Sequence, residues 1–283
     1  MKKFAAIATL FMLFPVAGAG FVSTSIDIEA NSPPPIGLDE SETIIANVTL
    51  NWGFGSFLPL PVEVYIEAKN VPEWLSVYIS PSKFTVTPDK ITGGSKGENV
   101  KITFRANKEV IAFIEYPVTI HAYTNGSFLL RGSEATKEIY VMEDFVDKGL
   151  TIEKPSAVQL YRGEFKTVYF NVTNNCNAPL YIEIEEENAS GFLLSYDEKI
   201  PVEAKGRVAI PIKIEAEESK EADIRLRFNY YPQFSPSQET VKNYEEIHLT
   251  LMSRTKPQGG ALAVGIVIVI IVLILFAIWR KRR

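Results

Sequence analysis

The chain has 283 residues, of which 46% are hydrophobic and 22% are charged, a composition typical of one to three folded domains rather than a disordered chain. One cysteine excludes a disulfide scaffold and a multi-cysteine metal cluster, and two histidines leave little for histidine-based catalysis or zinc binding. All 34 acidic residues lie in the middle of the chain, whereas 6 of the 29 basic residues lie at its ends, which argues against a nucleic-acid partner.

The first 19 residues have the order of a secretory signal. A short cationic start precedes the apolar run Phe4–Phe14, and small residues occupy positions 17 to 19. We therefore expect cleavage after Ala19 and a mature chain that begins near Gly20. A retained membrane anchor is the alternative, although the apolar run is short for a membrane span.

Between residues 20 and 252, apolar and polar residues mostly alternate, and no helical period stands out. Alternation predicts half-buried antiparallel strands. Seven segments in about 120 residues predict an immunoglobulin-like β-sandwich over 20–143, and a second series predicts another over 150–252. The expected strands are 23–29, 43–52, 62–69, 83–87, 98–106, 117–124 and 135–142 in the first series, and 150–153 with 158–160, 166–173, 180–186, 192–196, 207–216, 222–230 and 244–251 in the second.

Two short motifs occur once in each series. Asn47–Thr49 and Asn171–Thr173, both Asn-Val-Thr, close the second strand of their series. Ser95–Gly97 and Ala204–Gly206 each open a long strand. The repetition favours two similar tandem domains over one large barrel, joined by an acidic linker at 144–149.

The C-terminal segment 261–279 is uncharged and ends in tryptophan. As a helix its 19 residues would extend about 28 Å, close to the roughly 30 Å of membrane hydrocarbon. Four basic residues, 280–283, follow and place the C-terminus in the cytoplasm by the positive-inside rule. We therefore expect a single-pass type I protein of the cell membrane, with an extracellular all-β ectodomain, a short stalk at 253–260, one transmembrane helix and a basic tail.

Small residues recur at a spacing of four near the start of this segment, in the pairs Ala261/Gly265 and Gly259/Ala263. Such spacing lets two membrane helices approach closely, which offers a homodimer through the transmembrane helix. Small residues near a helix start also occur without dimerisation, so both interpretations stay open.

The stretch Gly163–Asn174, GEFKTVYFNVTN, resembles the opening strand of the cell-adhesion-related and carbohydrate-enzyme-associated immunoglobulin-like domains of archaeal and bacterial cell-surface proteins. Val71–Leu75, VPEWL, is similar to a segment of the same group. The resemblance covers both expected domains. It implies an extracellular structural or binding module, often of archaeal origin, with no catalytic residues.

Four Asn-x-Ser/Thr triplets are candidate glycosylation sites in an exported chain. Asn125 and Asn188 fall in expected turns and are the favoured acceptors, whereas chance alone also produces such triplets. The four candidates are Asn47, Asn125, Asn171 and Asn188.

Two aromatic loops are candidate contact surfaces. The loop 51–61 is apolar, and its Trp52, Phe54 and Phe57 form either an exposed tip for a protein or glycan partner or a plug that closes the end of the sandwich, the interpretation that we favour. The loop 230–234 is expected to provide interdomain packing, with a ligand site at the junction as the alternative. Its aromatic residues are Tyr230, Tyr231 and Phe234.

Glu143, Asp144 and Asp147 lie at the linker, where oxygen ligands can hold calcium between β domains. Calcium takes six to eight oxygens, so a solvated acidic linker is the better interpretation. Cys176 lies in an expected turn and is either a free thiol or a bridge between two chains.

Catalytic patterns are weak. His121 and His248 alternate with apolar residues, so both should point to the polar side of a strand, and neither has an evident catalytic companion. No glycine-serine elbow, paired-histidine motif or phosphate loop is present. We expect no enzyme, no cofactor and no metal.

The expected function is a structural, adhesive or partner-binding role at the cell envelope. An accessory subunit of a membrane transport, export or glycan-assembly complex is the first alternative. A carbohydrate-acting enzyme is less favoured, because it requires a carboxylate pair in a deep cleft, whereas a binding module requires a shallow aromatic surface.

Overall fold

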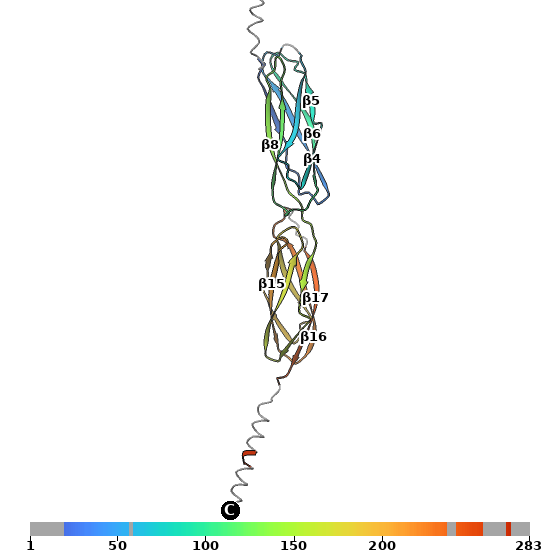
Figure 1. The fold of residues 1–283 in the computed structure, drawn as a ribbon, viewed down its shortest axis with the longest axis vertical. Coiled ribbons are helices and arrows are strands. Elements are labelled where there is room, and N and C mark those ends of the chain that lie inside the picture. The colour runs from blue at the N-terminus through green and yellow to red at the C-terminus, as the bar shows by residue number, and fades with distance from the viewer. Residues whose placement is uncertain (1–19, 57–58, 237–241, 257–269, 273–283) are drawn as a thin grey trace, which may run out of the picture. The chain divides into compact units, whose positions relative to one another are not determined.

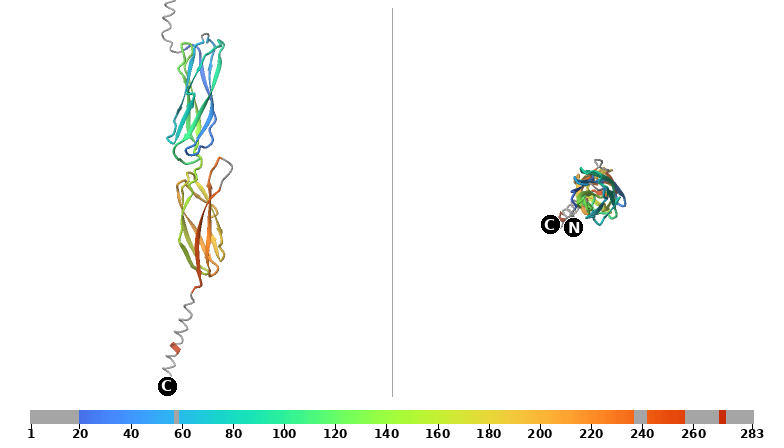
Figure 2. Two further views of the ribbon diagram at one scale, coloured as in Figure 1. Left: turned by 90° about the vertical axis from the view of Figure 1, so that its right-hand side faces the viewer. Right: turned by 90° about the horizontal axis from the view of Figure 1, so that it is seen from above.

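The computed structural model describes residues 20–56, 59–236, 242–256 and 270–272. The chain divides into two compact units. Unit 1 contains Met1–Lys148, Cys176–Pro179 and Phe234–Glu239, and unit 2 contains Gly149–Asn175, Leu180–Gln233 and Thr240–Arg283. Figure 1 shows unit 1 with blue to green strands and unit 2 with yellow-green to orange-red strands, and Figure 2 shows the same strands from two further sides.

Unit 1 consists of two four-stranded sheets. The first has the order β1-β2-β6-β4, with β1 at Thr24–Glu29, β2 at Ser41–Trp52, β6 at Gly94–Ala106 and β4 at Leu75–Ser80. The second has the order β5-β3-β7-β8, with β5 at Lys83–Val86, β3 at Val62–Lys69, β7 at Tyr116–Thr124 and β8 at Ser133–Val141.

The alternating sequence explains how these sheets pack. In β3, Val62, Val64 and Ile66 are buried, while the residues between them face away from the core. Successive side chains of a strand point to opposite faces of its sheet, so one face of each sheet is apolar. The apolar faces of the two sheets form one core, in which Phe104 and Ile120 are fully buried.

Unit 2 consists of a four-stranded and a five-stranded sheet. The smaller has the order β13-β15-β11-β9, with β13 at Phe192–Ser195, β15 at Arg207–Ala216, β11 at Phe165–Asn174 and β9 at Leu150–Glu153. The larger has the order β10-β17-β16-β12-β14, with β10 at Ala157–Tyr161, β17 at Asn243–Arg254, β16 at Glu221–Pro232, β12 at Leu180–Glu187 and β14 at Ile200–Val202.

The core of unit 2 joins its two sheets through aromatic rings. Phe170 lies on β11 and Phe228 on β16, and both are fully buried. Their ring centroids are 6.0 Å apart at an angle of 48°. Because the two strands belong to different sheets, this contact crosses the middle of the sandwich.

The two units share one strand order. The sheet β1-β2-β6-β4 corresponds to β9-β11-β15-β13, and β5-β3-β7-β8 corresponds to β14-β12-β16-β17. The additional strand β10 pairs with β17 in parallel, and in unit 1 an isolated parallel bridge from Ile36 to Glu143 takes its place. The all-β sandwich that the alternation predicts is therefore confirmed.

The register refines the predicted repeat. Asn47 pairs with Glu29 of the first strand, and Asn171 pairs with Glu153 of the equivalent strand, so the two Asn-Val-Thr motifs occupy the same place. The second pair of motifs is displaced by one residue, because Thr49 pairs with Gly97, whereas Thr173 pairs with Arg207. Ser95–Gly97 lies inside β6, and Ala204–Gly206 is a turn before β15.

Two strands, β4 and β14, were not predicted from the sequence. Both are the outermost strands of their sheets. In β4 the buried and exposed residues do not alternate cleanly, and β14 has three residues with Pro201 in the middle. An edge strand has one free hydrogen-bonding side and tolerates proline, so its sequence carries a weak signal.

The described parts of the chain contain no helix with the length and apolar character of a membrane span. Of the expected transmembrane helix at 261–279, the structure describes only residues 270–272. The signal at 1–19 and the basic tail at 280–283 lie outside the described residues. These three assignments stay predictions.

Candidate binding surface

Four loop segments lie together at one end of unit 1, the upper end in Figure 1, and we call them the tip. The tip comprises residues 20–23, 53–56, 89–93 and 125–132. Backbone hydrogen bonds join the segments: Val22 N–H donates to the Leu129 carbonyl at 2.9 Å, Gly53 N–H to the Ser23 carbonyl at 2.9 Å, and Gly55 N–H to the Ile91 carbonyl at 2.8 Å.

The aromatic loop 51–61 contributes both a plug and an exposed ring. Trp52 is only 6% exposed and belongs to the core, and its indole N–H donates to the Lys90 carbonyl at 3.3 Å. Phe54 is 76% exposed. The interpretation as a plug therefore fits Trp52, and the interpretation as an exposed contact residue fits Phe54. Phe57 lies outside the described residues.

Three further apolar side chains of the tip could not be selected from the sequence. They are Phe21, Ile91 and Phe128, which are 63%, 51% and 66% exposed. Each lies in a different loop and looks like an isolated surface residue in the sequence. Only the fold brings them to the same end as Phe54.

Glycines hold the tip backbone close together. Gly126 has φ of 74°, a left-handed conformation that residues with a side chain rarely adopt. A Cβ atom at Gly126 would lie 2.3 Å from the Leu130 carbonyl oxygen, and one at Gly20 would lie 2.2 Å from the Leu130 carbonyl carbon. The exposed rings therefore extend from a tightly packed base.

A polar hollow of about 370 Å³ lies next to the tip, over strands of the β5-β3-β7-β8 sheet. It is open to solvent and shares Asn125 and Gly132 with the tip. Its lining consists of Glu67, His121, Tyr123, Thr124, Asn125, Gly132, Ser133 and Glu134.

His121 lies on the outer side of β7, as expected, but it is buried and has companions. Its Nδ1 is 3.0 Å from Glu67 Oε1, and its Nε2 is 3.1 Å from Glu134 Oε2. Hydrogen bonds from His121 and then from Lys69 lower the pKa of Glu67. Both ring nitrogens therefore face carboxylates, and Lys69 Nζ also lies 2.9 Å from Nδ1.

The aromatic rings of this face stack in a row. Tyr65 and Tyr123 have centroids 5.3 Å apart, and Tyr123 and His121 have centroids 5.2 Å apart, with interplanar angles of 20° and 21°. Each ring covers the face of its neighbour. The row is therefore not the flat platform on which a sugar ring could stack.

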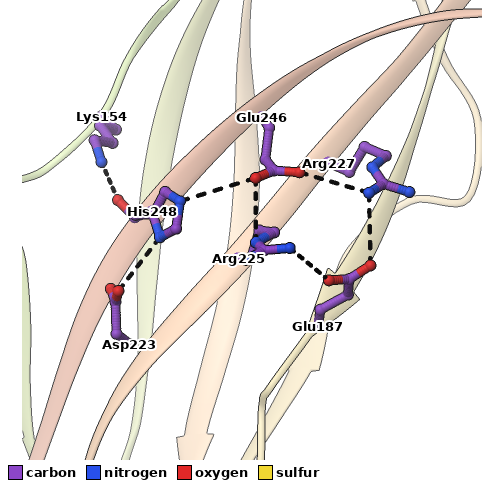
Figure 3. Close-up of polar contacts among 7 residues, drawn as sticks. All are labelled: Lys154, Glu187, Asp223, Arg225, Arg227, Glu246 and His248. Carbon is purple, nitrogen blue, oxygen red and sulfur yellow. Dashed lines mark hydrogen bonds and ion pairs between the residues drawn. The ribbon is translucent and has the colours of Figure 1, made fainter.

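Unit 2 carries a network of opposite charges on β12, β16 and β17 (Figure 3). Exposed pairs of this kind contribute about 0–1 kcal/mol each. The cations and carboxylates neutralise one another, so we interpret the network as support for the sheet. Arg225 lies 3.2 Å from Glu187 and 3.1 Å from Glu246, Arg227 lies 3.6 and 3.5 Å from the same two carboxylates, and His248 lies 3.3 Å from Asp223.

The four glycosylation candidates have different surroundings. Asn125 and Asn188 are exposed and lie outside the strands. Asn47 is exposed within β2, where its side-chain oxygen accepts a hydrogen bond from Thr49. Asn171 is half-buried within β11. Glycosylation of any of them stays a prediction.

The three aromatic residues of loop 230–234 are also placed differently. Tyr230 is buried in unit 2, and the Tyr231 hydroxyl donates to Glu183 at 2.7 Å. Phe234 belongs to unit 1, where its ring lies 6.0 Å from that of Phe113. These positions do not test the predicted role of the loop in interdomain packing.

The prediction that the linker carboxylates are solvated is wrong for Glu143. Its side chain is fully buried and accepts a hydrogen bond from Val110 N–H. Asp144 and Asp147 are exposed. Across the described ranges, no three His, Cys, Asp or Glu side chains lie close enough together to hold a metal ion. Cys176 is buried, and its thiol donates a hydrogen bond to Asp147 Oδ1 at 3.4 Å.

Burial raises the pKa of Glu143 above its ordinary 4.5, so we expect a defined pH dependence of stability. A raised pKa contributes stability that is full below pH 4.5 and is lost as the pH rises through the folded-state pKa. The melting temperature of unit 1 should therefore contain a component that falls as the pH increases above 4.5. Glu143→Gln should flatten this fall, and Asp144→Asn, an exposed control, should not. Equal slopes in the wild type and Glu143→Gln would contradict the assignment.

Comparisons with known proteins do not assign the chain to a family. No family model and no curated protein matches the chain. Similar solved structures include a PapD-like domain of human CEP192, with 11% identity and a TM-score of 0.32, covering 38% of this chain and 86% of that domain. They also include a Caenorhabditis elegans MSP family member, WR4, with 17% identity and a TM-score of 0.27, covering 36% of this chain and 97% of that one. A Porphyromonas gingivalis protein of unknown function has 12% identity and a TM-score of 0.29, covering 80% of this chain and 99% of that one.

These likenesses carry no functional argument. The two pairs of packed sheets themselves define a β-sandwich protein of immunoglobulin-like type.

Proposed function

We propose that the chain is a single-pass type I surface protein whose β-sandwich ectodomain binds a partner through the tip of unit 1. The tip carries the proposal: Phe21, Phe54, Ile91 and Phe128 expose more than half of their surface at one end of a folded unit. Soluble monomers rarely gather large exposed apolar side chains, and such patches commonly mark interaction sites.

The membrane topology rests on the sequence. An apolar start at 1–19 supports export, and the uncharged segment 261–279 followed by four basic residues supports a C-terminal anchor with a cytoplasmic tail. Strand β17 ends at Arg254, two residues beyond the expected domain end. Six residues then precede position 261, a reach of about 20 Å, so unit 2 would stand near the bilayer.

Binding is favoured over catalysis by the arrangement around His121. Its two nitrogens face Glu67 and Glu134, and Lys69 Nζ also lies near Nδ1. A carbohydrate-acting enzyme would need two carboxylates free to act on the glycosidic bond. A glycan at the exposed Asn188, which lies outside the tip, fits the same extracellular proposal.

An accessory subunit of a membrane complex is the second candidate. Ala261/Gly265 offers a small-residue face for another helix or a second copy. In native membranes, cross-linking to one stable intramembrane partner would favour this role, whereas contact with another surface would favour adhesion.

The topology is tested by fractionating cells and treating intact cells with protease. The full chain should stay with the membrane in alkaline carbonate, and added protease should remove the ectodomain. A variant that ends at Lys256 should be released, whereas a variant that lacks only residues 280–283 should stay membrane-bound. A full chain found in the cytosol, or an ectodomain protected in intact cells, would overturn the proposal.

A further inference from the structure

The tip combines exposed rings with positive charge in a unit that is otherwise acidic. Residues 20–148 contain 17 acidic and 10 basic side chains. The tip segments contain two basic side chains, Lys90 and Arg131, and one acidic side chain, Asp89. All three are exposed. Lys90 and Arg131 are therefore the cationic side chains that the tip offers to an anionic surface.

The apolar side chains are presented as a fixed set. Trp52 packs beneath them in the core, and backbone hydrogen bonds join their loops. Gly20 and Gly126 approach Leu130 so closely that no side chain fits at either position. A preorganised set loses little conformational freedom on binding.

Aromatic and aliphatic side chains flanked by Lys and Arg suit the boundary between lipid headgroups and acyl chains. Phosphate groups would attract Lys90 and Arg131, while the rings of Phe21, Phe54 and Phe128 enter the apolar layer. A second copy of the tip would instead bring like charges together. We propose that the tip of unit 1 docks on the surface of an anionic lipid bilayer.

The path of the chain through each unit indicates which bilayer this is. In unit 1, β8 begins next to the tip at Ser133 and runs away from it toward the residues that lead into unit 2. In unit 2, Gly149 lies near Glu245 at the start of β17, and the chain leaves at the other end of β17. The chain therefore enters each unit at one end and leaves it at the other. The proposal commits to an opposing bilayer and rests on the proposed C-terminal anchor.

The test uses the full chain reconstituted into neutral phosphatidylcholine vesicles. These are mixed with protein-free fluorescent vesicles of phosphatidylcholine alone or with phosphatidylserine, and the fluorescence that co-sediments with the protein vesicles is measured. We expect capture of the anionic vesicles. Phe54→Ser/Phe128→Ser should reduce this capture about tenfold or more, because two large apolar contacts are lost. Lys90→Glu/Arg131→Glu should abolish the preference for anionic lipid.

The matched control is Ile45→Ser/Tyr78→Ser, which removes two similarly exposed apolar side chains from the β1-β2-β6-β4 sheet of unit 1, outside the tip. It should capture vesicles like the wild type, and all variants should keep the wild-type melting temperature. Failure of the wild type to capture anionic vesicles, equal losses in the control, or capture only when both vesicle populations carry the chain would overturn the inference. Carbonate-resistant incorporation into the first vesicles is scored separately, because its failure would refute the anchor rather than the tip.

Discussion

Trp52→Ser is expected to lower the free energy of unfolding of unit 1 by about 3–5 kcal/mol. Trp52 is nearly buried, belongs to the core and donates to the Lys90 carbonyl, so serine would leave a large cavity and remove one of the two hydrogen bonds that this carbonyl accepts. Its ring also lies against Gly94, where a Cβ atom would be 2.8 Å from Trp52 Cζ2. Calorimetry of the full chain should show that the transition of unit 1 moves to a lower temperature.

The matched change is Phe54→Ser, two residues later in the same loop. Because Phe54 is exposed, its replacement should alter stability by less than about 0.5 kcal/mol. This pair separates the plug from the exposed tip. Equal destabilisation by the two substitutions would show that Phe54 packs as Trp52 does.

Phe228→Ala is expected to destabilise unit 2 by about 3–5 kcal/mol and to leave the unfolding of unit 1 unchanged. The substitution removes a fully buried ring and its contact with Phe170 across the sandwich. Tyr244→Ala is the control, since Tyr244 is exposed on the neighbouring strand β17. Calorimetry should show that only the unit 2 transition shifts. A shift of both transitions by Phe228→Ala would mean that the two units unfold together.

The strands could be predicted because each carries its own signal. In β3 and β15 the apolar residues alternate over the whole strand, and the predicted bounds agree with the structure. The strands β4 and β14 lie at sheet edges, where one side is unpaired and the alternation is weak. The alternation rule therefore finds the central strands and also edge strands such as β1 and β8, but it misses these two edge strands, whose patterns are irregular or very short.

The candidate surface was less predictable because it depends on neighbours that are distant in the sequence. Phe54 could be selected from an unusually apolar loop, but Phe128 lies more than 70 residues away and only the fold brings it to the same end of unit 1. The carboxylates near His121 come from β3 and β8 through the strand register. Glu143 looked solvated because its burial depends on contacts that the linker sequence does not reveal.

The parallel pairing of β10 with β17 has a mechanical consequence for a tether. Tension between the two ends of unit 2 would pull its early strand β10 and its last strand β17 in opposite directions, so five paired residues would resist in shear together. In the equivalent place unit 1 has an isolated parallel bridge at Ile36–Glu143. Under a force that stretches both units, unit 1 would therefore unfold before unit 2.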